Sequence, residues 1–176
     1  MFEIERKWLL NHMPEDIENR FTIIDHYNVE QFYISTDPNF RVCKIIKPDE
    51  TICFINYKSK GKIKREEYVV YISESTYESF KLNDIGNKKP ITKDFYRLIF
   101  NDKYELEVNN IDNGSFYYCE IEFFTEKEAI EFDSAEIEKF LGQDVRDVTF
   151  LDYFKMKNYW DITRNKNKTF TCDLIS

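Results

Sequence analysis

The sequence predicts one mainly β domain of the α+β class, built from about eight antiparallel strands with a few flanking helices. Polarity alternates with a period of two along most of the chain, which is the strand signal. Only four glycines and four prolines punctuate the chain. The 176 residues, 42% apolar and 17% aromatic, are sufficient for one substantial core. We therefore expect a single domain over residues 1–160 and a loose polar tail over 161–176.

Eight segments carry the strand pattern, because each is rich in Ile, Val, Phe and Tyr and alternates with polar residues. They are residues 2–10, 22–35, 39–47, 51–58, 64–72, 91–100, 103–110 and 116–124. Asn101-Asp102 and Asp112-Asn113-Gly114 are turn sequences between neighbouring segments. Strands joined by such short turns are expected to pair antiparallel.

The helices are predicted from capping residues that can satisfy the free amides of a first turn. Ser75 with Glu78 predicts a helix that ends near Asp84, before Gly86. Thr125 with Glu128 predicts a second helix over 126–132. A third is expected over 134–141, ended by Gly142, and a last helical stretch over 152–160.

Charge and composition restrict the function. A net charge of −8 and a pI near 4.9 argue against nucleic-acid and membrane-surface partners, which would repel an acidic protein. No apolar run is long enough to span a bilayer, and the N-terminus lacks the regions of a signal peptide, so we expect a cytoplasmic protein. The four cysteines lie far apart and suggest neither a zinc site nor disulfides.

Charged residues repeat on one face of several predicted strands. Glu3, Glu5 and Lys7 share a face of the first strand because side chains alternate along a strand. Paired acids recur at Glu105 and Glu107, and again at Glu120 and Glu122. Basic residues on other strands are Arg41, Lys58, Arg65 (beside Glu67), Lys93 and Arg97.

Two arrangements explain these rows. In a half-exposed sheet the charged rows face water and the apolar rows face the core. In a barrel the charged rows line the interior and helices cover the apolar outside. The acids would then need bound cations or basic partners, and hard cations such as Mg²⁺ or Mn²⁺ take oxygen ligands of this kind. Metal together with Lys and Arg would suit a polyphosphate.

Several blocks resemble, in order, the motifs of the CYTH domain, the triphosphate tunnel metalloenzymes. Glu3-Ile4-Glu5-Arg6-Lys7 resembles the E-x-E-x-K signature that opens this family. The other matching blocks, across residues 2–158, are Gln31-Phe32-Tyr33-Ile34, Phe40-Arg41-Val42, Tyr57-Lys58-Ser59, Arg65-Glu66-Glu67-Tyr68, Ile91-Thr92-Lys93, Tyr104-Glu105-Leu106-Glu107-Val108, Cys119-Glu120-Ile121-Glu122-Phe123, Val148-Thr149 and Phe154-Lys155-Met156.

The resemblance implies an eight-stranded antiparallel β-barrel, or tunnel, that hydrolyses a small triphosphate with Mg²⁺ or Mn²⁺. The implied metal ligands are Glu3, Glu5, Glu120 and Glu122. Glu67, Glu105 and Glu107 would complete an acidic wall. Phosphate would be bound by Arg41, Lys58, Arg65, Lys93, Arg97 and Lys155. Lys7, coupled with Lys93, would position or deprotonate the attacking water, and a homodimer is possible.

The sequence also departs from the family pattern. Cys43 replaces the second arginine of the R-x-R strand, Phe95 stands where an arginine is expected, and Tyr153 and Val69 replace further charged residues. Arg97 lies one step beyond Phe95 on the same face and is a substitute. Four functions are therefore open: a triphosphatase acting on tripolyphosphate, nucleoside triphosphate or thiamine triphosphate; a non-catalytic phosphate- or nucleotide-binding module; a class IV adenylate cyclase; and a structural domain with solvated charges.

Overall fold

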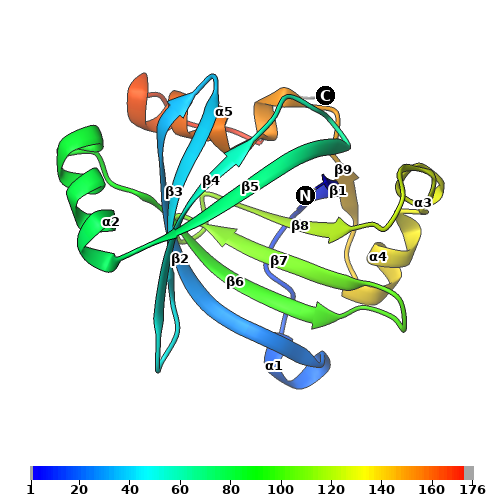
Figure 1. Ribbon diagram of the computed structural model, residues 1–176. Helices are drawn as coiled ribbons and strands as arrows, with labels where there is room; N and C mark the ends of the chain where they lie inside the picture. The colour runs from blue at the N-terminus through cyan, green and yellow to red at the C-terminus, as the bar shows by residue number, and fades with distance from the viewer. Residues whose placement is uncertain (1, 173–176) are drawn as a thin grey trace.

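The computed structural model describes residues 2–172, and eight of its strands form a closed antiparallel barrel. The strand order is β5-β4-β3-β2-β6-β7-β8-β1, with β1 returning to β5 and a short ninth strand added beside β1. The strands are β1 (Phe2–Leu10), β2 (Ile23–Thr36), β3 (Asn39–Ile46), β4 (Thr51–Lys58), β5 (Lys64–Ile72), β6 (Ile91–Ile99), β7 (Glu105–Ile111), β8 (Phe116–Glu122) and β9 (Val145–Asp147). The predicted eight-stranded barrel is confirmed (Figure 1).

Strand β1 closes the barrel because it has partners on both sides. Its first residues pair with β5, with Glu3 opposite Arg65. Its later residues pair with β8, with Lys7 opposite Glu120. The acidic and basic residues of β1 therefore meet oppositely charged residues from strands far away in the sequence.

The apolar rows face outward and are covered by helices, whereas the charged rows face the barrel interior. On one side, Trp8 and Ile121 are buried together with Ile137 and Leu141 of helix α4 (Ala135–Leu141). On another side, Tyr77 of helix α2 (Glu74–Phe80) packs against Phe32. Of the two arrangements considered from the sequence, the structure has the barrel.

Helices flank the barrel on opposite sides and cover one end. Figure 1 shows α2 on one side, α3 (Glu126–Glu131) and α4 on the other, and α5 (Met156–Trp160) across the upper end. A short helix α1 (Ile17–Arg20) precedes β2. Tyr159 of α5 contacts Phe116 at 5.1 Å between ring centroids, and Trp160 contacts Tyr33 at 6.2 Å. These aromatic contacts join α5 to the interior face of the strands.

The predicted helices occur with altered limits. Ser73, not Ser75, is the N-cap of α2, because its Oγ accepts a hydrogen bond from the Thr76 amide at 3.1 Å. The predicted continuation to Asp84 is a π-helical turn, η1 (Lys81–Ile85), and residues 152–160 divide into the 3-10 turn η2 (Asp152–Phe154) and α5. Thr125 caps α3 as predicted. Helix α1 and strand β9 were not predicted, since both are too short to show periodicity.

The C-terminal segment differs from the predicted loose tail. Residues Asp161–Asn165 form a π-helical turn, η3, and Arg164 makes a 2.6 Å ion pair with Asp112. Phe170 stacks on Tyr153 at 4.6 Å and contacts Phe116 at 5.0 Å. Residues 161–172 thus pack on the barrel because apolar and charged side chains within this polar segment find partners there. The rest of the predicted tail, 173–176, lies outside the described residues.

Within residues 2–172 there is no helix with the length and apolar character required to span a bilayer.

Candidate active site

A cavity of about 700 Å³ occupies the barrel interior and opens beside α5. Its inner walls carry the rows of charged residues that face inward from seven strands. The charged residues of these strands that line it are Glu3, Glu5, Lys7, Arg41, Lys58, Arg65, Glu67, Lys93, Glu107 and Glu120. This volume is typical of small-molecule sites.

The two carboxylates of β1 are paired with cations of neighbouring strands. Lys58 Nζ lies 2.8 Å from Glu3 Oε1, and Arg65 Nε lies 2.8 Å from Glu3 Oε2. The Arg65 guanidinium also forms an ion pair with Glu5. Burial by itself would raise the pKa of Glu5, but the positive charges of Arg65, Lys58 and Lys7 lower it below its ordinary value. Glu5 is consequently an ionised carboxylate available to a cation.

Lys7, further along β1, is paired in a similar way with a residue of β8. Its Nζ is 2.9 Å from Glu120 Oε1 and 4.1 Å from the centroid of the Tyr118 ring. The side chains of Lys7 and Glu120 are only 13% and 15% exposed. Lys7 is therefore a shielded ammonium, held by a carboxylate and an aromatic face.

Arg41 and Lys93 are cavity cations that form no direct ion pair with a carboxylate of the described residues. Among residues 2–172, neither side chain has a carboxylate within ion-pair distance; Lys93 Nζ instead donates to Tyr118 Oη at 2.8 Å. Arg41 Nε is buried without a hydrogen-bond partner in this part of the chain. Burial and the charge of Arg41 lower the pKa of Lys93 to about 8. Two neighbouring shielded cations without a direct ion pair mark a candidate site for an anion.

Glu107 faces Glu120 across the β7–β8 pair. Burial and the charge of Glu120 raise the pKa of Glu107 to about 7. Glu107 also accepts a hydrogen bond from Arg97 at 2.9 Å. The structure thus brings Glu107 and Glu120 together, whereas Arg97, Glu105 and Glu122 lie beyond the cavity lining, and Glu105 and Glu122 are exposed.

The carboxylates of the cavity offer only oxygen ligands, which are the ligands that hard divalent cations prefer. Within residues 2–172 no three acidic, His or Cys side chains are already gathered as a metal-binding group. Glu3, Glu5 and Glu120 are held by Lys58, Arg65 and Lys7 instead. A cation would have to replace these basic partners; Glu107, whose pKa is raised by burial and by the charge of Glu120, would gain from a nearby cation.

Three departures from the family pattern supply no charge to the cavity. Cys43 is buried at 2% exposure, and burial raises the pKa of its thiol. Phe95 stacks on Tyr27 with 4.5 Å between ring centroids. Tyr153 stacks on Phe170 and does not line the cavity. These three positions therefore add no positive charge to the cavity.

Sequence reasoning missed several cavity residues. Tyr118, which contacts both Lys7 and Lys93, shares a face with Glu120 and could have been found from the period of two. Lys60, Lys62 and Lys157 also line the cavity, near the predicted Lys155. Lys60 and Lys62 continue an alternation of lysines that begins at Lys58 in the sequence. The sequence does not show that the loop carrying them lies at the cavity opening, because that depends on tertiary structure.

The comparisons with known proteins support the fold. No protein-family model and no curated protein matches this sequence. Solved structures do match. The inorganic triphosphatase NE1496 has a TM-score of 0.59 and 21% identity, covering 89% of this chain and 93% of that chain. The PH1819 protein from Pyrococcus horikoshii OT3 has a TM-score of 0.62 and 19% identity, covering 94% and 100%. HpAC1 from Hippeastrum, a putative adenylyl cyclase described as having a dominant triphosphatase activity, has a TM-score of 0.60 and 14% identity, covering 94% and 96%.

These likenesses extend over nearly the whole barrel, so they define the class of fold. The chain shares their closed-barrel fold, which is the fold implied by its resemblance to the CYTH domain.

Proposed function

We propose that this protein hydrolyses a phosphoanhydride bond of a small triphosphate inside the barrel, with a divalent metal ion. The observation that carries the proposal is the pair Arg41 and Lys93, two shielded cations without carboxylate partners in residues 2–172. Triphosphatase activity in two proteins of the same fold adds support. Among inorganic tripolyphosphate, nucleoside triphosphates and thiamine triphosphate we favour the first, because the sequence contains no base-recognition motif.

In this proposal the chain's own residues bind the phosphates and handle the proton. Arg41 and Lys93 contact the terminal phosphate, while Lys58, Arg65 and Lys155 neutralise the rest of the chain. Water attacks the terminal phosphorus and the bridging P–O bond breaks, giving orthophosphate and a chain shorter by one phosphate. Lys93 is the better proton acceptor, since its pKa near 8 leaves part of it as a free amine at neutral pH. Lys7, paired with Glu120, orients the water.

The metal ion in the proposal is Mg²⁺ or Mn²⁺. Glu3, Glu5 and Glu120 would hold it, together with Glu107, which lies opposite Glu120 on the neighbouring strand. When bound, it would neutralise phosphate oxygens.

The test is phosphate release from tripolyphosphate, ATP and thiamine triphosphate with Mg²⁺ or Mn²⁺. We expect turnover by wild type, and a loss of at least about 100-fold in kcat for Lys93→Met and Glu5→Gln, in line with the loss of a catalytic group. Lys127→Met, which removes an exposed lysine on α3, is the matched control. Correctly folded wild type without turnover on any of the three substrates would refute the proposal.

A second candidate is a module that binds a phosphorylated ligand without cleaving it. The ion pairs of Glu3, Glu5 and Glu120 favour this second function, because their basic partners neutralise these carboxylates in the absence of metal. Tripolyphosphate binding without turnover, measured by calorimetry, would establish this function. Product analysis with ATP separates hydrolysis from the cyclase reaction, since only the latter yields cyclic AMP.

A further inference from the structure

One stretch of β5 has a neighbouring strand on one side only. Along one side, β4 pairs with residues 67–72 of β5. Along the other side, β1 pairs only with residues 64–66 of β5. Among residues 2–172, no strand lies on that second side of residues 68–72, which we call the open edge. Because hydrogen-bonding groups alternate along an antiparallel strand, part of the backbone amides and carbonyls of the open edge point away from β4.

The open edge is apolar on both of its faces. Its sequence, Tyr68-Val69-Val70-Tyr71-Ile72, contains no charged residue and no proline, and its pairing with β4 is regular. The first four of these side chains are between 44% and 74% exposed. Strand edges that stay in solvent usually carry charges, prolines or bulges, which prevent pairing with another chain. The open edge lacks these features and is therefore suited to pairing with a further strand.

Two other strand segments with an open side are protected in this structure. Strand β9, at the end of the sheet beside β1, is only three residues long and carries Arg146 and Asp147. Strand β6 pairs with β2 only as far as Gln31, but α5 lies over the rest of β2, and Lys157 donates to the Thr36 carbonyl oxygen at 3.1 Å. The exposure of the open edge is therefore a specific feature of β5.

We infer that two copies of this protein pair through the open edge, with their β5 strands antiparallel about a two-fold axis at Val70. In this register Tyr68 lies opposite Ile72 of the second copy, and Val69 lies opposite Tyr71 of the second copy. Each side chain meets an apolar side chain on the same face of the joined sheet, and none of the five pairs contains a charge. Cross-strand pairs of aromatic and β-branched residues are favourable. The open edge is thus complementary to itself, as a two-fold contact requires.

The contact is small, so the dimer should be weak. The open edge would bury on the order of 400 Å² per chain, since a buried aromatic side chain contributes about 200 Å² and both tyrosines are partly exposed. A stable interface buries about 800 Å² per partner. We therefore expect a dissociation constant of roughly 1–100 μM.

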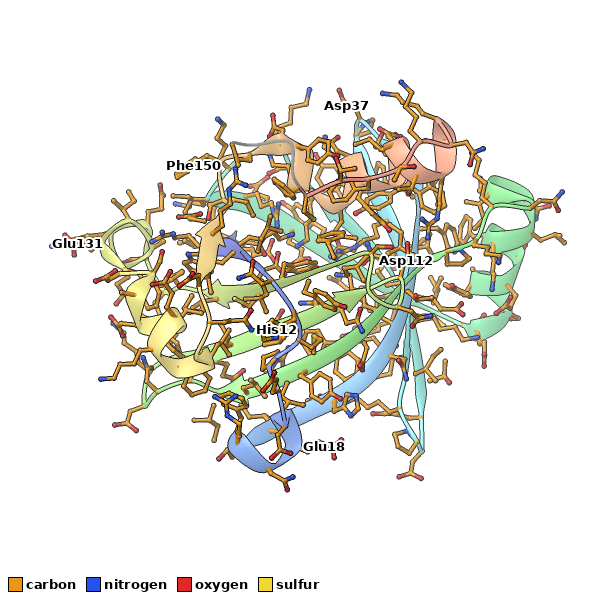
Figure 2. The ribbon with its side chains drawn as sticks, turned by 180° about the vertical axis from the view of Figure 1, so that it is seen from behind. His12, Glu18, Asp37, Asp112, Glu131 and Phe150 are labelled. Atoms are coloured by element: carbon orange, nitrogen blue, oxygen red, sulfur yellow. The ribbon has the colours of Figure 1, made fainter. Side chains whose placement is uncertain are left out.

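Sedimentation equilibrium of the full chain, from about 1 to about 300 μM, measures this association. The test variant is Val70→Lys, which sets two like charges opposite each other at the two-fold axis. The control is Ile130→Lys, because Val70 and Ile130 are similarly exposed, at 61% and 68%. Figure 2 shows Glu131, next to Ile130, on the other side of the barrel from α2, the helix that follows β5. We expect Val70→Lys to raise Kd at least about tenfold and the control to change it less than about twofold.

A cross-link tests the register. Residues directly opposite each other in an antiparallel pair have Cα atoms about 4.5–5.5 Å apart, which a disulfide can span. Val70→Cys should therefore form a covalent dimer on oxidation, seen on a non-reducing gel, whereas Ile130→Cys should not. Both variants carry Cys172→Ser, which removes the native cysteine that is partly exposed.

Wild type that stays monomeric up to about 300 μM would refute the second copy as the partner and leave the open edge to an extended segment of another protein. A dimer that Val70→Lys leaves unchanged would place the interface elsewhere and overturn the inference. Equal cross-linking through Val70→Cys and Ile130→Cys would do the same. Circular dichroism of each variant checks the fold, and if Val70→Lys does not fold, the cross-link in Val70→Cys decides the question.

Discussion

Lys93 indicates an anion site because its buried positive charge destabilises the folded protein when no anion is bound. An isolated ammonium in a shielded cavity is unfavourable unless something compensates it, and here Tyr118 Oη is a neutral partner at 2.8 Å. Among the charges around it, the like-charged Arg41 affects its pKa more than the carboxylate of Glu120 does. The side chain therefore reduces the stability of the free protein at neutral pH, and this cost is recovered when an anion binds.

We expect Lys93→Met to stabilise the free protein at pH 7 by an amount on the order of 2 kcal/mol. The folded-state pKa of Lys93 is lowered to about 8 from its ordinary value of about 10.4. The cost is thus fully present below pH 8 and disappears as the pH rises through 8 to about 10.4, where the unfolded chain holds more protons. Urea unfolding of both proteins at pH 7 and pH 10 measures it. A gain that does not shrink at pH 10, or no gain at all, contradicts the argument; Lys127→Met serves as the control.

At the scale of the element, short helices depend on individual polar contacts. The N-cap of α2 is Ser73, whose Oγ accepts from the Thr76 amide. The C-terminal end of helix α3 is capped by Arg6 of β1. Its guanidinium donates hydrogen bonds to the carbonyl oxygens of Ala129 and Phe132, both at 2.8 Å. Arg6 also pairs with Asp147, so one guanidinium joins β1, α3 and β9.

Ser73→Ala should destabilise the protein by about 1 kcal/mol, whereas Ser75→Ala should cost less than about 0.5 kcal/mol. Only Ser73 satisfies a free amide of the first turn. Thermal or urea unfolding of the two variants side by side decides which serine is the cap, and equal losses would argue against the observed geometry.

Arg6→Lys should cost about 2–4 kcal/mol, because one ammonium cannot replace the buried, forked contacts to two carbonyls and a carboxylate. Arg20→Lys, at the exposed last residue of α1, is the control and should cost less than about 0.5 kcal/mol. Urea unfolding reports both. A loss for Arg6→Lys no larger than the control would show that the three contacts contribute little.

At the scale of the whole molecule, ion pairs across the barrel hold three of its interior carboxylates without a metal ion. Lys58 and Arg65 hold Glu3 and Glu5, and Lys7 holds Glu120. The metal of the proposed reaction is therefore not needed for folding.

Chelation with EDTA should abolish phosphate release while leaving the melting temperature within about 1 °C. Tripolyphosphate in the absence of metal should still stabilise the fold, by about 2.7 kcal/mol at one hundred times its dissociation constant. Calorimetric melting with and without each additive tests this. A large fall in melting temperature on chelation would mean that the carboxylates depend on a cation for their stability.

Much of the barrel could be predicted from the sequence, because alternation over seven or more residues fixes both the strand and the face of each charge. The limits of β4 and β5 match the predicted segments. What could not be predicted depends on tertiary contacts. The three residues of β9 have no period of their own, and Glu122 shares its face with Glu120 yet lies outside the cavity. The exposure of Glu122 follows from its place at the end of β8.

The pairing of β1 on both sides also sets the order in which the molecule can assemble. The strand synthesised first finds its main partner only after residues 116–122 have left the ribosome, and β9 comes later still. Until then the first strand has no complete partner, and Trp8, fully buried in the finished barrel, remains exposed. Pairings between such distant segments form slowly, and an unpaired strand edge invites aggregation. Nascent chains that end before β8 should therefore need a chaperone, because the barrel can close only after β8 has been synthesised.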